Sequence, residues 1–151
     1  MPRQDHTVTI KTLLKDPKVS LRTIVPTAPI AQAITMLAAD DTSALLVTND
    51  NQTIDGILSS SDIVKYLDDH KQVSNEILVL DVMTKDVITC DAKDPVQRLE
   101  LLMTQNNVRH IPITDAGSPV ALIGIIDVTR HRLSLAEGEM SQMRDFVSGA
   151  S

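Results

Sequence analysis

The residues best able to do chemistry in this sequence lie in one short stretch, Gly56–Asp62, which reads GILSSSD. The stretch ends a strand-like run and opens a helical pattern, and the free backbone N–H groups at the start of a helix suit phosphate. The Ser59 hydroxyl can donate to a phosphate oxygen, and the Asp62 carboxylate can accept both hydroxyls of a ribose. Gly56 lets another group approach the strand backbone closely. Together these groups suit a ribose phosphate.

A simpler interpretation of the same residues needs no ligand. Ser59 is a natural N-cap for a helix, and Asp62 follows three residues later, as in a capping box. A plain capping arrangement therefore explains both residues, and the two interpretations stay open at this point.

The elements that position this stretch occur twice in the chain. Residues 19–67 and 86–133 each contain a short extended piece, a proline, a helical pattern, two strand-like runs around a polar turn, and a second helix. The interval from Pro29 to Pro95, which precede the first helix of each unit, equals the interval from Val47 to Ile113 in the strand-like runs. This shared spacing predicts an internal repeat of β-α-β-β-α units.

One such unit is too small to bury its sheet well. We therefore predict an α/β fold in which two units pack sheet on sheet around a pseudo-twofold axis. The expected segments are an N-terminal extension (1–18), a first repeat (19–75), a second repeat (76–135) and a C-terminal helical tail (136–151). The amphipathic piece Val8–Leu14 predicts one extra helix within the extension.

Short motifs in this chain resemble tandem cystathionine β-synthase (CBS) repeats. Gly56–Asp62 has the form Gly-h-h-Ser-x-x-Asp of their nucleotide signature, where h is hydrophobic. Asn107–Asp115 resembles their second-strand motif, with a weaker counterpart at 43–48, and Val82–Thr84 resembles the entry to a second repeat. The resemblance covers roughly residues 19–135 and implies a stand-alone regulatory pair of repeats.

The resemblance also implies a ligand site in a cleft between the repeats. One repeat supplies phosphate and ribose contacts, and the first strand of the other lines the adenine at Val87 and Ile88. Arg109 and His110 either point toward the phosphates, where arginine offers a charge-assisted bond, or are simply exposed at the start of a strand. The residues expected at this site are Ser59, Asp62, Gly56, Ile57, Leu58, Val87, Ile88, Arg109, His110 and Pro112.

The second repeat departs from the family pattern when Gly124 is matched with Gly56. The interval between these glycines exceeds the interval between the prolines, which predicts a second hairpin two residues longer than the first. The match also places Asp127 where serine would donate to phosphate, and Arg130 where aspartate would hold ribose. We therefore expect that the second cleft does not hold a nucleotide in the usual way. Arg130 would instead contact phosphate in the first cleft or bind another anion.

The function implied is that of a sensor. We expect a regulatory module that binds an adenine nucleotide, with AMP as the first candidate and ADP, ATP, NAD(H) or an S-adenosyl compound behind it. No obligatory cofactor is expected. The alternative is a ligand-free interaction module that regulates a partner by docking. No nucleophile–base constellation is visible, so we do not expect an enzyme, and the histidines lack the spacing of metal ligands.

Composition and charge limit the expected partners and the expected location of the protein. The net charge of −6 disfavours non-specific binding to nucleic acid or anionic membrane, both of which need clustered lysine and arginine. No apolar run reaches membrane-spanning length, and the lone Cys90 cannot form an internal disulfide, so we expect a cytoplasmic protein.

The C-terminal residues form a helical seam with apolar side chains at alternating spacings of three and four. The seam consists of Leu133, Ala136, Met140, Met143 and Val147. It either packs against its own chain or pairs with a second subunit, and we expect a homodimer. Gly138 interrupts the seam and argues against a long straight helix.

Overall fold

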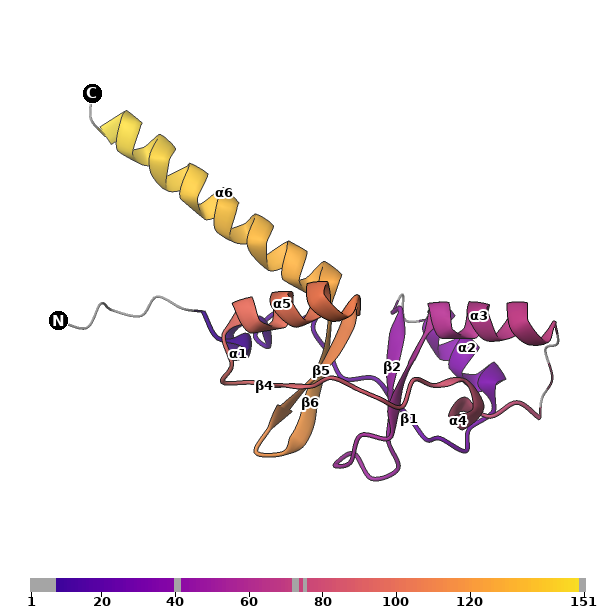
Figure 1. The fold of residues 1–151 in the computed structure, drawn as a ribbon. Helices are drawn as coiled ribbons and strands as arrows, with labels where there is room; N and C mark the ends of the chain where they lie inside the picture. The colour runs from indigo at the N-terminus through magenta and orange to yellow at the C-terminus, as the bar shows by residue number, and fades with distance from the viewer. Residues whose placement is uncertain (1–7, 40–41, 72–73, 75, 150–151) are drawn as a thin grey trace.

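The computed structural model describes residues 8–39, 42–71, 74 and 76–149. Two halves lie side by side, each with a three-stranded sheet and helices packed against it (Figure 1). The two sheets have the same construction, with the first pair of strands parallel and the second pair antiparallel. The predicted repeat of β-α-β-β-α units is confirmed.

The first half contains a sheet in the order β1-β2-β3. Its central strand is buried along its whole length, as expected of an aliphatic run between two neighbours. The strands are β1 (Thr23–Ile24), β2 (Ala44–Val47) and β3 (Gly56–Ser59). Its helices are α2 (Ile30–Ala39), α3 (Ser60–His70) and α4 (Val79–Val82).

The second half repeats this plan in the order β4-β5-β6. Pro95 directly precedes its first long helix, in extended conformation, where the missing N–H leaves no bond unmade. The strands are β4 (Cys90–Asp91), β5 (His110–Asp115) and β6 (Ser118–Gly124). The helices are α1 (Ile10–Leu13), α5 (Val96–Asn106) and α6 (Ile125–Gly149).

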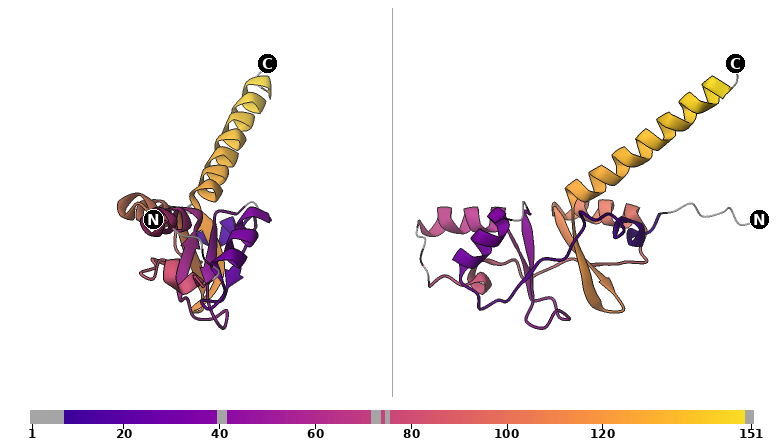
Figure 2. Two further views of the ribbon diagram at one scale, coloured as in Figure 1. Left: turned by 90° about the vertical axis from the view of Figure 1, so that its right-hand side faces the viewer. Right: turned by 180° about the vertical axis from the view of Figure 1, so that it is seen from behind.

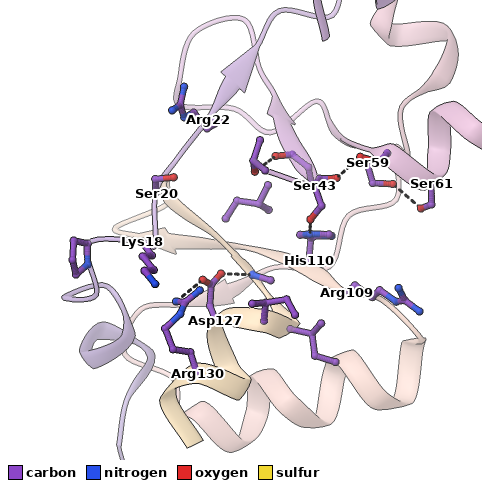
Figure 3. A pocket seen from close by; sticks show the side chains of 18 residues that line it. Lys18, Ser20, Arg22, Ser43, Ser59, Ser61, Arg109, His110, Asp127 and Arg130 are labelled. Atoms are coloured by element: carbon purple, nitrogen blue, oxygen red, sulfur yellow. Dashed lines mark hydrogen bonds and ion pairs between the residues drawn. The ribbon is translucent and has the colours of Figure 1, made fainter. Parts of the chain in front are cut away.

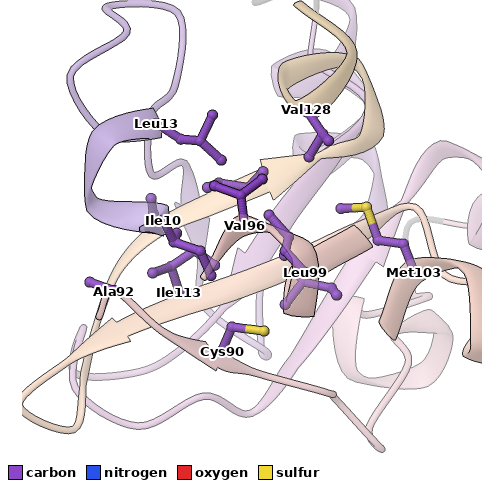
Figure 4. Close-up of a cluster of buried hydrophobic side chains, with 12 residues drawn as sticks. Ile10, Leu13, Cys90, Ala92, Val96, Leu99, Met103, Ile113 and Val128 are labelled. Atoms are coloured by element: carbon purple, nitrogen blue, oxygen red, sulfur yellow. The ribbon is translucent and has the colours of Figure 1, made fainter. Parts of the chain in front are cut away.

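The halves exchange short segments. The helix expected within Val8–Leu14 is present as α1, and its Ile10 and Leu13 are buried against β5, α5 and α6 of the second half (Figure 4). In the same way, Ile77 and Val79 fill the core of the first half. Each half is therefore completed by the chain that precedes the other, which ties the two together.

A third apolar cluster joins the two sheets. Ala44, Leu46 and Ile57 of the first half are buried there, and Val87 and Leu122 of the second half pack against them. This cluster confirms the predicted packing of sheet on sheet. The face between the sheets is aliphatic.

The second hairpin is shorter than predicted. β5 and β6 are joined by a tight turn at Ala116 and Gly117, both with positive φ. The loop between β2 and β3 spans residues 48–55. The expectation of a longer second hairpin is wrong, because it rested on matching Gly124 with Gly56.

Helix α6 is continuous over 25 residues and projects from the body of the molecule (Figures 1 and 2). Gly138 lies inside it without interrupting it, so that expectation is wrong. The seam side chains remain exposed, with Met143 and Val147 each 69% accessible. The interpretation that the seam packs against its own chain is therefore also wrong. In the part of the chain that the structure describes, no helix has the length and apolar character needed to cross a membrane.

Candidate functional site

A cavity of about 900 Å³ lies where the two halves meet. Its walls come from the segment 17–22, from the starts of β2 and β5, and from the first turns of α3 and α6 (Figure 3). The cationic side chains that line it are Lys18, Arg22, Arg109 and Arg130. Asp127 is the single carboxylate among the described lining residues. Such a lining favours an anion that also carries hydroxyl donors.

The first turn of α3 presents its serines to this cavity. Asp62 and Ser59 form a capping box, in which Asp62 N–H donates to Ser59 Oγ at 3.1 Å and Ser59 N–H donates to Asp62 Oδ2 at 2.9 Å. Ser59, Ser60 and Ser61 all line the cavity. Capping and ligand contact are thus compatible, because the capped helix start still faces open space.

The first turn of α6 is built like that of α3. Gly124 N–H donates to Asp127 Oδ2 at 2.9 Å, the same distance as the bond from Ser59 N–H to Asp62 Oδ2. In the strand ladders, Gly124 lies opposite His110 just as Ser59 lies opposite Ala44. Gly124 is therefore the counterpart of Ser59.

This register overturns the predicted equivalence in the second repeat. Asp127 occupies the position of Asp62, not that of Ser59, and Arg130 lies one turn further along α6. Burial agrees, because Leu58 and its new counterpart Ile123 are both fully buried, whereas Ile126 is 68% exposed. The second half thus keeps the carboxylate at its helix start, with Gly124 in place of the serine and Ala121 in place of Gly56.

Arg130 is held by two carboxylates. Its Nη1 donates to Asp16 Oδ2 at 2.7 Å and to Asp127 Oδ1 at 3.0 Å. The backbone N–H of Lys18 also donates to Asp16, and together with Arg130 it holds the pKa of that carboxyl below its usual value. Arg130 therefore links Asp16, just before the segment 17–22, to the start of α6. Contact of Arg130 with a ligand in the first cleft stays a prediction.

Arg109 and His110 line the cavity at the start of β5, next to the start of α6. His110 Nε2 lies 2.7 Å from Ser43 Oγ, so the two halves meet through this hydrogen bond. Burial lowers the pKa of His110, and Arg109 acts in the same direction against Asp127 and Asp62. The imidazole is therefore kept neutral near pH 7. Arg109 is exposed, and its carbonyl accepts the N–H of Ile125 at 2.9 Å.

The segment that enters the second repeat lies against the first cleft, as Ser20 lies against the second through the bond from Leu122 N–H to its carbonyl oxygen at 3.2 Å. Thr84 pairs with Ile57 through two backbone bonds of 3.0 and 2.8 Å, and its Oγ1 donates to Asp62 Oδ1 at 3.2 Å. A Cβ built on Gly56 would lie 2.6 Å from the carbonyl oxygen of Thr84. Gly56 thus admits the segment that enters the second repeat, and the close approach predicted there is made by Thr84 of the same chain.

The other expected site residues lie away from the cavity. Leu58 and Pro112 are fully buried, and Val87 packs between the sheets. Ile88 is half-buried, and neither it nor Asp62 lines the cavity. Of the expected set, the cavity brings together Ser59, Arg109, His110 and Arg130.

Comparison with known proteins agrees with this architecture. The profile of the CBS domain matches residues 10–69 and again residues 79–134. The chain belongs to the CBS domain family. The matched segments include α1, which completes the second half of the CBS pair.

Solved structures of similar CBS proteins have the same fold. The CBS-domain containing protein ATU1752 from Agrobacterium tumefaciens is 29% identical, with a TM-score of 0.76 over 83% of this chain and 99% of that one. A second CBS domain structure, NE2398, is 30% identical, with a TM-score of 0.78 over 85% and 99% of the two chains.

A curated relative extends beyond the matched region. The mitochondrial CBS domain-containing protein CBSX3 of Arabidopsis thaliana is 25% identical over 124 residues, which is 80% of this chain and 60% of that protein. The chain thus spans less than two thirds of the length of this relative.

Sequence reasoning missed the segment that leads into β1. Lys18, Ser20 and Arg22 line the cavity. The signal was available in the repeat itself, because Arg22 stands as far before Pro29 as Ile88 stands before Pro95. The lining of the second cleft could have been predicted from that of the first.

The remaining candidate reactive groups of the CBS pair are Cys90, possible metal ligands and the Ser43–His110 contact. Burial raises the pKa of the Cys90 thiol, which keeps it protonated and unreactive. Among the described residues no group of three His, Cys, Asp or Glu side chains is placed to hold a metal ion. Ser43 and His110 form a serine–histidine contact, but no described side chain hydrogen-bonds to the second ring nitrogen to orient it.

Proposed function

We propose that this CBS pair is a regulatory module that binds an adenosine compound in the cavity between its halves. The observation that carries the proposal is the cavity lining, which combines the Asp127 carboxylate at a helix start with the cations Arg109 and Lys18. Its volume of about 900 Å³ lies within the range of small-molecule sites. AMP is the first candidate, with ADP, ATP, NAD(H) and S-adenosyl compounds behind it.

The lining suggests how such a ligand would lie. The Asp127 carboxylate would accept the ribose hydroxyls, and the adenine would lie along the segment 17–22. The phosphate would face the N–H groups at the starts of α3 and α6, together with Ser59 and Arg109. A ribose hydroxyl at Asp127 Oδ1 would compete with the Arg130 guanidinium that donates to that oxygen.

This orientation places the ligand against α6. The first turn of α6 forms one wall of the cavity, and the same helix continues into the projecting arm. A ligand that draws Arg130 away from Asp127 and Asp16 would therefore act on the base of the arm. This is a physical route by which occupancy could be read by a partner.

Ligands of two other CBS proteins are consistent with the proposal. The CBS pair of MJ0100 was crystallised with 5′-methylthioadenosine and S-adenosyl-L-methionine, and CBSX2 was crystallised with AMP. They are 24% and 20% identical to this chain, so their likeness supports the fold, and the ligand rests on the residues of this cavity.

Isothermal titration with AMP, ADP, ATP, NAD and S-adenosylmethionine tests the proposal. We expect binding of at least one compound, and weaker binding of its 2′,3′-dideoxy analogue, because the analogue lacks the hydroxyls that Asp127 would accept. Absence of heat with every compound would favour the alternative of a ligand-free docking module. The cytoplasmic location stays a prediction from the single cysteine.

A further inference from the structure

The arm of α6, residues 133–147, exposes apolar side chains that its own chain does not cover. Met140 is 55% exposed, Met143 69% and Val147 69%. The helix before the arm is anchored to the body, where Val128 is buried and Arg132 pairs with Glu100. The arm is thus held rigidly at one end and unpartnered beyond it.

The apolar residues of the arm fall on one seam. Leu133, Met140 and Val147 are seven residues apart, and Ala136 and Met143 lie between them, which is the a and d pattern of a coiled coil. From Leu133 to Val147 the seam spans about 21 Å at 1.5 Å per residue. All five side chains are exposed. The seam is therefore long enough for two heptads.

The charged residues beside the seam favour pairing with the same helix of a second copy of this chain. Glu139 occupies a g position and Arg144 the e position five residues later, which are the positions that meet between helices in a parallel pair. Neither residue has an oppositely charged neighbour three or four residues away in its own helix. Glu139 of one copy and Arg144 of another would form two equivalent ion pairs across the interface.

We propose that the arms of two copies of this chain pair as a parallel, two-stranded coiled coil. The proposal is independent of any ligand. Parallel pairing places both bodies at the same end of the coil, so the two cavities would lie beside each other at its base. In an antiparallel pair g positions face g positions, so Glu139 would not meet Arg144, and cross-linking at position 147 distinguishes the two directions.

Cysteine cross-linking tests the pairing and its direction. Native Cys90 is buried and gives a low background. Under mild oxidation, Val147→Cys should give a disulfide-linked dimer, because equal a positions face each other in a parallel coil. Asp145→Cys is the matched control, since position 145 faces outward, and it should remain monomeric on non-reducing gels.

Charge exchange supplies a second test. Glu139→Arg should lower the association constant about tenfold in sedimentation equilibrium, because like charges then meet at both edges. Adding Arg144→Glu to that variant should restore association. Failure of Val147→Cys to cross-link, equal cross-linking of Asp145→Cys, or no rescue by the charge exchange would overturn the proposal. Circular dichroism confirms that each variant remains folded.

Discussion

Asp62 and Asp127 form a matched pair of carboxylates that separates helix capping from ligand binding. Each accepts a backbone N–H at 2.9 Å at the start of its helix. Replacing either by alanine should therefore lower the free energy of unfolding by a similar amount, about 1 kcal/mol. Urea denaturation of the two variants measures this shared effect.

The two substitutions should differ in their effect on ligand affinity. Asp127 lines the cavity, whereas Asp62 does not. A hydrogen bond to a charged group contributes about 1.5–3 kcal/mol, so losing one ribose contact weakens binding at least about tenfold. We expect that loss for Asp127→Ala and less than about a twofold change for Asp62→Ala, measured by titration calorimetry. The reverse order would refute the assignment of the site to the second cleft.

Other consequences can be tested by stability measurements. Because the pKa of His110 is lowered by burial, the unfolded chain binds the extra proton first, so stability should fall as pH drops below about 6.5. His110→Asn should remove that part of the slope in urea titrations at pH 5.5 and 7.5. Gly56→Ala should destabilise the fold by about 1–3 kcal/mol in the same assay, because its Cβ would meet the Thr84 carbonyl. Gly138→Ala, with open space around its Cβ, should stabilise α6 by about 0.5–1 kcal/mol in thermal melts followed by circular dichroism. A destabilised Gly138→Ala or a neutral Gly56→Ala would contradict these contacts.

The repeat made most of the fold predictable. The order of elements follows from local patterns, which are sufficient to define strands and helices. These patterns are the prolines at the same place in each unit, the aliphatic runs and the polar turns. The exchange of α1 and of Ile77 and Val79 between halves was not predictable. It depends on contacts between segments far apart in sequence, which periodicity does not report.

The candidate site was predictable only in part. Ser59, Arg109 and His110 were singled out from their motifs, and all three line the cavity. The register of the second repeat was misjudged because Gly124-Ile125-Ile126 imitates Gly56-Ile57-Leu58 in sequence. Only burial and hydrogen bonding separate the two, since Ile126 faces solvent where Leu58 is buried.

The contact of Thr84 with the start of α3 was also not predictable from the sequence. Thr84 belongs to the motif at the entry to the second repeat. Its residue type does not predict that its hydroxyl hydrogen-bonds to Asp62 or that its carbonyl oxygen lies against Gly56. A motif specifies which groups are present. The path of the neighbouring chain decides which of them remain accessible.

A crystal structure of the protein soaked with AMP tests the central claim most directly. The account predicts a nucleotide between the halves, with its ribose hydroxyls on Asp127 and its phosphate near Ser59 and Arg109. A ribose on Asp62 with the adenine against Val87, or crystals that bind no nucleotide at saturating AMP, would contradict it.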